Sequence, residues 1–273
     1  MNAAIQRHSI VLQRIDITGP KTAGDINRFS VTSIFSECLN LEALYIGPYD
    51  HLEPFDHLEA YGHSEYYVTL DSVLKYPWRC TGLTDLRLSI SGCEMPPVDP
   101  GIQPYYLRPA PIALSEAETQ HFVRLECLYR QIGALTALRH LWLDTVPLNS
   151  QGQLDEGAYD INLSFPAMLN LPDTATEGGR PGYLDHLSGL KQLSWLEGSV
   201  YAGTEETKVT MGWAEARWIN QNWPRLSQAN FFSHQSEVRE PFAWLYKRRK
   251  EDGGVLPYVV VAQEGYRYQG GMR

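Results

Sequence analysis

Residues 83–88, Leu-Thr-Asp-Leu-Arg-Leu, follow the pattern Leu-x-x-Leu-x-Leu. The last two leucines are two residues apart, so they share one face of a short strand, while the first covers the turn that leads into it. With aliphatic substitutions the pattern recurs at Leu12/Ile15/Ile17, Leu41/Leu44/Ile46 and Leu138/Leu141/Leu143, with weaker copies at Leu193/Leu196 followed by Gly198 and at Leu226/Ala229/Phe231. Such recurrence is typical of solenoid proteins, in which equivalent strands stack side by side.

The segments between these strands have helical periodicity. The clearest begins at Ser115, where Glu118 completes a capping box, and places Leu125, Leu128 and Ile132 on one stripe. Two further helices are predicted over 25–38 and 214–222, the latter ending before a proline that disfavours helical geometry. The fold class predicted is therefore α/β: an irregular leucine-rich-repeat solenoid, with a curved parallel sheet and helices on its outer face.

Successive copies begin 29 to 55 residues apart, whereas regular leucine-rich repeats span about 20 to 29 residues. Inserted loops near 47–66, 92–114 and 165–182, or additional strands, are expected to account for the excess, and six prolines mark the second of these loops. A further strand is considered at 159–164. The repeats are expected to occupy 1–239, with 240–273 as a C-terminal cap or tail.

The charge balance excludes broad classes of partner. A net charge of -9 disfavours nucleic acid and anionic membranes, because both need clustered cations. The one basic run, at 247–250, is interpreted as a solvated helix end or loop rather than an import signal. Four scattered cysteines without zinc spacing, and the lack of an apolar leader or of about 20 consecutive apolar residues, favour a cytoplasmic or nuclear protein with no cofactor, metal or membrane partner.

Several units resemble one protein family. Residues 34–44, Ile-Phe-Ser-Glu-Cys-Leu-Asn-Leu-Glu-Ala-Leu, and 78–86, Trp-Arg-Cys-Thr-Gly-Leu-Thr-Asp-Leu, are similar to the repeats of F-box and leucine-rich-repeat proteins. Residues 132–141 and 218–226 resemble further units of members expanded in filamentous fungi of the Mortierella type. This resemblance, over roughly 10–232, implies substrate recognition within a ubiquitin ligase. No F-box is recognisable before the first repeat, so a Skp1-like adaptor is expected as a partner only if an F-box is present elsewhere.

The residues beside the inward leucines point to the opposite face of the strands. A protein or peptide partner is therefore predicted to contact Arg14, Asp16, Tyr45, Asp85, Arg87, His140, Trp142, Asp144, Trp195 and Glu197. Trp142 and Trp195 are the preferred anchors, because exposed aromatic side chains commonly dominate binding energy. The alternative is that insertions cover this surface or that both tryptophans pack on their neighbours. Trp78, Trp218 and Trp223 are expected to be core residues instead.

A hydrolase-like enzyme is the alternative function. It would use the histidines and carboxylates of 51–63, namely His51, Glu53, Asp56, His57, Glu59 and His63. Histidines six residues apart do not share a helical face, so an exposed polar loop is favoured over a metal site. No nucleophile elbow, phosphate loop, dinucleotide fingerprint or zinc-protease helix occurs in the sequence. A non-catalytic protein-interaction module is therefore the preferred interpretation.

Overall fold

The computed structural model describes most of the predicted repeat strands and helices. The described residues are 8–17, 31–47, 67–96, 101–146, 165–173, 178–198, 200, 212–229 and 240–254.

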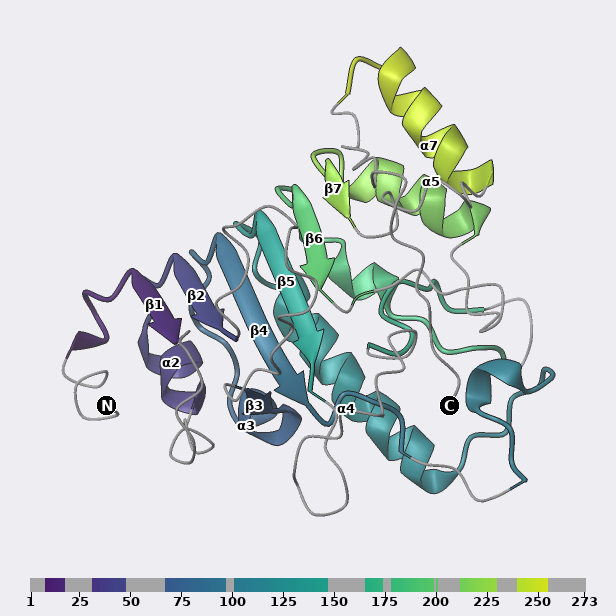
Figure 1. The fold of residues 1–273 in the computed structure, drawn as a ribbon, viewed down its shortest axis with the longest axis horizontal. Coiled ribbons are helices and arrows are strands. Elements are labelled where there is room, and N and C mark those ends of the chain that lie inside the picture. The colour runs from purple at the N-terminus through teal and green to yellow at the C-terminus, as the bar shows by residue number, and fades with distance from the viewer. Residues whose placement is uncertain are drawn as a thin grey trace, which may run out of the picture.

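A single seven-stranded sheet runs through these residues (Figure 1). Its strands are β1 (Arg14–Ile17), β2 (Ala43–Ile46), β3 (Val68–Thr69), β4 (Asp85–Ser91), β5 (His140–Thr145), β6 (Trp195–Gly198) and β7 (Gln228–Ala229). Six strands lie side by side in the order β1-β2-β4-β5-β6-β7, and β3 pairs with the end of β4. Every described pair is parallel. The prediction that the strands around Leu44, Leu86 and Leu141 are parallel neighbours in one sheet is confirmed.

The apolar positions of the repeated pattern form rows across the sheet. The central row consists of Ile15, Leu44, Leu86, Leu141, Leu196 and Ala229, each paired in register with the next. Its four leucines are fully buried, and so are the residues two positions later in β2, β4 and β5. Stacking thus gives each short strand the neighbours it needs to remove its leucines from water, at about 25 cal/mol per Å² of apolar surface.

The same turn precedes five of the strands. The N–H of the first leucine donates to the carbonyl oxygen three residues earlier, over 2.9 to 3.2 Å, at Leu41, Leu83, Leu138, Leu193 and Leu226. The next residue donates to the equivalent carbonyl of the preceding copy, over 2.7 to 2.9 Å, at Glu42, Thr84, Arg139, Ser194 and Ser227. All five leucines are fully buried. Each turn therefore satisfies its backbone groups locally and fixes the register with its neighbour.

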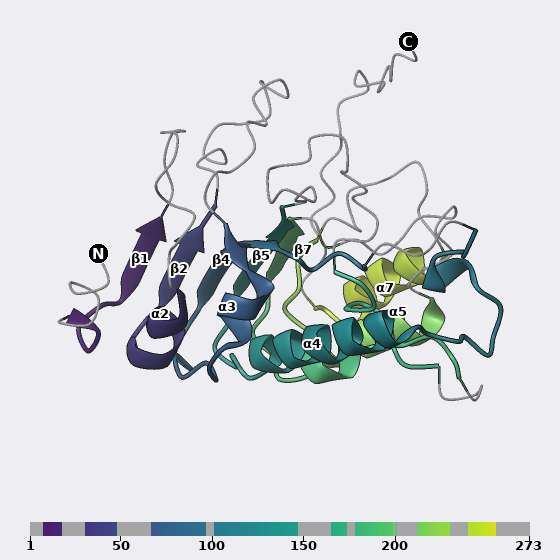
Figure 2. The same cartoon turned by 90° about the horizontal axis from the view of Figure 1, so that it is seen from below.

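The described helices are distributed unevenly about the sheet. They are α2 (Val31–Glu37), α3 (Leu70–Leu74), α4 (Glu116–Gly133), α5 (Trp213–Asn222) and α7 (Glu240–Glu251), with short 3-10 turns η2 (Tyr105–Leu107) and η4 (Leu184–Leu187). Figures 1 and 2 show α2, α3 and α4 on the same side of the sheet, and no described helix crosses the opposite face.

The longest helix, α4, begins where the sequence predicts. The hydroxyl of Ser115 accepts from the N–H of Glu118, and the Glu118 carboxylate accepts from the N–H of Ser115. The same carboxylate receives two bonds of 2.8 Å from the guanidinium of Arg108, which lies in the proline-rich insertion. The predicted stripe through Leu125, Leu128 and Ile132 is fully buried. One glutamate thus caps the helix and attaches the insertion to it.

The other predicted helices and core tryptophans are found in part or in full. Of the helix predicted over 25–38, the structure describes α2 alone, since 18–30 lie outside the described residues. Helix α5 ends before Trp223, which is fully buried. Trp78 stacks on Phe35 with ring centroids 4.1 Å apart, and Trp218 meets Trp223 edge to face at 5.3 Å. All three tryptophans therefore pack in or against the core, as predicted.

The insertions add little regular structure where they are described. Between 92 and 114 the described residues hold η2 and no strand, and those of 165–182 form neither helix nor strand. The predicted loop at 47–66, except for Gly47, and the considered strand at 159–164 lie outside the described residues. Strand β3 and helix α3 fall between the second and third copies, so part of that long interval is additional secondary structure.

The basic run at 247–250 is not uniformly solvated, which corrects the interpretation from sequence. It forms the last turns of α7, and Arg249 is buried while its three neighbours are exposed. Its guanidinium donates to the carbonyl oxygens of Leu226 and Trp223, the latter over 2.7 Å. The turn after α5 ends in carbonyl groups that need donors, and a cation at that end is favourable. Arg249 therefore joins α7 to the last described repeat.

Candidate functional site

The face of the sheet opposite α2, α3 and α4 is the candidate site, and we call it the open face. It contains the ten residues predicted from the sequence: Arg14, Asp16, Tyr45, Asp85, Arg87, His140, Trp142, Asp144, Trp195 and Glu197. They come from five neighbouring strands and alternate along each strand with apolar residues, which are buried except for the half-buried Ile15 of β1. Because successive side chains of a strand point to opposite faces, the structure brings all ten to one side of the sheet.

Two rows cross the open face. The first contains Arg14, Ala43, Asp85, His140, Trp195 and Gln228, in register from β1 to β7. The second contains Asp16, Tyr45, Arg87, Trp142 and Glu197. Adjacent members of a row belong to strands about 4.8 Å apart, so their side chains can touch. Sequence reasoning missed Ala43 and Gln228, although both follow from the same alternation.

Basic or imidazole side chains on this face lie against an aromatic ring of the next strand. The guanidinium carbon of Arg14 lies 4.8 Å from the ring centroid of Tyr45, and Arg87 lies at the same distance over Trp142. The rings of His140 and Trp195 are 5.2 Å apart and inclined by 50°. A cation over an aromatic face is attracted by the ring quadrupole, by about 0.5 to 2 kcal/mol depending on exposure. These contacts align the side chains across the sheet.

The carboxylates are held by hydrogen bonds from their neighbours. Nδ1 of His140 lies 2.5 Å from Oδ1 of Asp85, whose other oxygen accepts from the hydroxyl of Thr84 over 2.6 Å. The indole N–H of Trp142 donates to Asp144 over 2.5 Å. The side-chain amide of Gln228 donates to Glu197. The open face is therefore an ordered polar surface in which the carboxylates have defined orientations.

Partial burial changes the acidity of two groups on the open face. Burial raises the pKa of the Glu197 carboxyl, and the Gln228 hydrogen bond and the nearby His140 oppose that shift. Burial also raises the pKa of the Tyr45 hydroxyl, and the negative charge of Asp85 adds to the effect. Both causes disfavour an additional negative charge on an already acidic surface.

The two anchor tryptophans differ in exposure. Trp195 is 44% exposed, whereas Trp142 is half-buried beneath the guanidinium of Arg87 and held by Asp144. The prediction placed both on the shared surface, and the structure does so. The alternative, in which both tryptophans pack on their neighbours, holds for Trp142, which packs on Arg87. Trp195 is consequently the more accessible of the two indoles.

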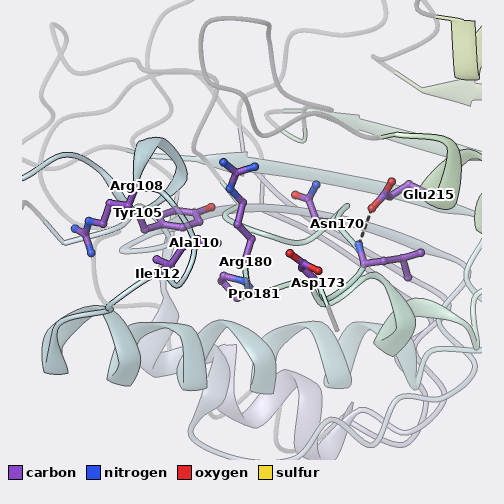
Figure 3. Close-up of a pocket in the computed structure, with 10 residues that line it drawn as sticks. Tyr105, Arg108, Ala110, Ile112, Asn170, Asp173, Arg180, Pro181 and Glu215 are labelled. Atoms are coloured by element: carbon purple, nitrogen blue, oxygen red, sulfur yellow. Dashed lines mark hydrogen bonds between the residues drawn. The ribbon is translucent and has the colours of Figure 1, made fainter. Parts of the chain in front are cut away.

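A pocket of about 300 Å³ lies away from the open face, where the proline-rich insertion approaches residues 170–173, residues 180–181 and the start of α5 (Figure 3). Ligand pockets commonly measure 300 to 1,000 Å³, so it is at the small end. Its polar groups support the fold: Arg108 holds Glu118, and Glu215 accepts from the backbone N–H groups of Leu171 and Gly212. These contacts connect the insertions to helices α4 and α5, so the polar groups around the pocket have structural roles.

Nothing in the described part of the chain assembles a group of three or more potential metal ligands. The histidines and carboxylates of the alternative enzyme hypothesis, at 51–63, lie outside the described residues. None of the described helices is long and apolar enough to cross a lipid bilayer.

The chain was also compared with known proteins. No protein-family model, curated protein or solved structure matches it.

Proposed function

We propose that this protein is a non-catalytic protein-interaction module, an irregular leucine-rich-repeat solenoid whose open face binds a protein or peptide partner. The observation that carries the proposal is the register of the five strands, which places aromatic and charged side chains in two continuous rows. Aromatic anchors supply apolar burial, and oriented charges reject unsuitable partners.

The repeated turn supports the solenoid part of the proposal. Every described repeat from β2 onward satisfies its backbone in the same way and buries an equivalent leucine. In such a fold each unit contacts mainly its neighbours, so inserted loops of different lengths are tolerated between units. Helix α7 then serves as a C-terminal cap through Arg249. The cap protects the apolar side of the last described repeat.

Site-specific photo-crosslinking tests the binding role. A photoreactive amino acid replaces Ala43, which lies between Arg14 and Asp85 in the first row, and in a second protein replaces Val123, which is 55% exposed on α4. In cell extract, irradiation should give discrete adducts from position 43 and few from position 123. Adducts from both positions alike, or from neither, would contradict binding at the open face.

We also propose, on the resemblance to F-box and leucine-rich-repeat proteins, that the bound partner is a substrate for ubiquitin transfer. The equivalent places of Cys38 and Cys80 support this extension, since each is buried three residues before a buried first leucine. Co-purification with a Skp1-like adaptor from the native host tests it. If crosslinking gives partner adducts but no adaptor or ubiquitin-ligase subunit co-purifies, the protein is an interaction module without a ligase role.

A further inference from the structure

The open face carries more negative than positive charge. Its carboxylates are Asp16, Asp85, Asp144 and Glu197, and its guanidinium groups are Arg14 and Arg87. Four carboxylates against two guanidinium groups leave an excess of two negative charges, His140 not counted, in keeping with the net charge of -9 for the chain. A partner that approaches this face is favoured if its contacting segment is basic, and an acidic segment is repelled.

The guanidinium groups of the open face also leave one aromatic ring available. Arg14 covers Tyr45 and Arg87 covers Trp142, each at 4.8 Å. The neighbour of Trp195 is the imidazole of His140. In the described part of the chain, the aromatic rings that lie under a lysine or arginine are those of Tyr45, Tyr76, Trp142 and Trp213, and Trp195 is not among them. This indole is also the most exposed aromatic residue of the open face, at 44%.

The surroundings of Trp195 suit a planar cation. Glu197 lies two residues further along β6 on the same face. At the rise of a β-strand, the Cα atoms of the two residues are about 6.6 Å apart. Asp85 lies beyond His140 in the first row. A guanidinium stacked on the indole can direct its edge N–H groups to a neighbouring carboxylate, which a compact ammonium does less well. The arrangement would repeat the contact between Arg87 and Trp142.

We propose that an arginine in a basic segment of a partner protein stacks on Trp195 and forms an ion pair with Glu197. This inference rests on the proposed binding role of the open face and specifies the chemistry of the partner. His140 occupies, beside Trp195, the place that Arg87 occupies beside Trp142, so the partner arginine stacks on the part of the indole that His140 leaves exposed. Acidic or purely apolar segments lack the charge that this site complements.

A library of random linear peptides displayed on phage, selected against the full purified chain, provides the probes. The selected peptides should be enriched in arginine. Replacing the critical arginine by citrulline, which keeps the shape and removes the charge, should weaken binding about tenfold or more, as expected for a lost cation–π contact and ion pair. Binding is measured by fluorescence anisotropy with synthetic, labelled peptides.

Variants of the protein locate the contact. Trp195→Ala and Glu197→Gln should each weaken the arginine peptide about tenfold. Glu197→Gln should have little further effect on the citrulline peptide, because the charge pair is already absent. The matched control is Trp213→Ala, which removes an indole of similar exposure, 42%, from α5. The control should bind as the wild type does, and circular dichroism verifies that each variant is folded.

The inference would be overturned if the selected peptides lack a basic residue and the Trp142→Ala variant no longer binds them. The proposed function would still stand in that case. Arginine peptides that bind Trp195→Ala and Glu197→Gln at full strength would overturn it as well. Failure to select any peptide contradicts recognition of a linear basic segment, whereas the crosslinking from position 43 decides the binding role independently.

Discussion

Arg249 of α7 donates to the carbonyl oxygen of Trp223 over 2.7 Å, so a guanidinium near the C-terminal end of one helix completes the end of another. The two residues are 26 positions apart in sequence. Burial lowers the pKa of Arg249 to about 10, but the group is still charged near neutral pH. Its bonds to backbone oxygens offset part of the cost of removing the charge from water.

Arg249→Ala is expected to lower the free energy of unfolding by about 2 to 4 kcal/mol, because it removes the guanidinium bonds to the carbonyl groups of Leu226 and Trp223 and opens a space between α5 and α7. Arg248→Ala is the matched control. Arg248 is exposed and pairs with Asp252, so its loss should change stability by less than about 0.5 kcal/mol. Urea denaturation followed by circular dichroism gives both values. Equal effects would mean that the α7 contact is unimportant for stability.

Leu86→Ala and Leu141→Ala should each cost about 2 to 5 kcal/mol, the usual range for truncating a buried leucine. These residues pair in register at the centre of the sheet and are 1% exposed. Val123→Ala on the solvent side of α4 is the control and should be nearly neutral. Unchanged urea midpoints for both leucine variants would show that the two leucines are not in the core.

Glu118→Gln should destabilise the protein at pH 7 by about 1 to 3 kcal/mol, through the loss of charge in the capping box and in the bond to Arg108. Although burial alone raises it, the pKa of Glu118 in the fold is lowered by the bonds from Arg108 and Ser115. The charged form therefore stabilises the fold above the unfolded pKa, about 4.3, and that contribution is lost as pH falls through the folded value.

The difference between wild type and Glu118→Gln should accordingly shrink as urea midpoints are measured from pH 7 down to pH 3.5. The control is Glu116→Gln at the exposed start of α4, where a small and nearly constant difference is expected. A difference for Glu118→Gln that stays the same or grows toward low pH would contradict the assigned ionisation.

Trp142→Ala and Trp195→Ala should differ in stability although both lie on the open face. Trp142→Ala removes the contact with Arg87 and the hydrogen bond to Asp144, which should lower the free energy of unfolding by about 1 to 2 kcal/mol. Because Trp195 is more exposed, Trp195→Ala should lower the free energy of unfolding by less than about 0.5 kcal/mol. Thermal melting checks both variants, and a larger loss for Trp195→Ala would reverse the assigned roles.

The four cysteines are free thiols, and Cys127 is the exposed one. A thiol-reactive disulfide reagent should therefore modify one thiol rapidly in the native protein and all four in urea. Burial raises the pKa of Cys80 to about 11 and that of Cys93 well above its usual range, so these thiols are protonated as well as inaccessible near neutral pH. Cys127→Ser should abolish the rapid phase. More than one rapid thiol in the native protein would contradict this burial.

The sequence revealed those features that depend on local periodicity. Residues alternating along a strand share a face, so the positions of Asp85 and Arg87 followed from the leucines beside them. Helix α3 was not identified, because its five residues are too few to show a helical period. The different exposures of Trp142 and Trp195 depend on Arg87, 55 positions before Trp142, and such contacts require knowledge of the packing. The burial of Arg249 within a basic run has the same origin.

The turn repeated before five of the strands makes the spacing of neighbouring strands independent of the length of chain between them. Its hydrogen bonds run between equivalent residues of neighbouring copies, from Glu42 to Gln13 and from Arg139 to Thr84 for example, over the same distance to within 0.1 Å. The intervening chain is 28 residues in the first case and 54 in the second. Segments of different length can therefore be inserted between units while the two rows of the open face keep their spacing.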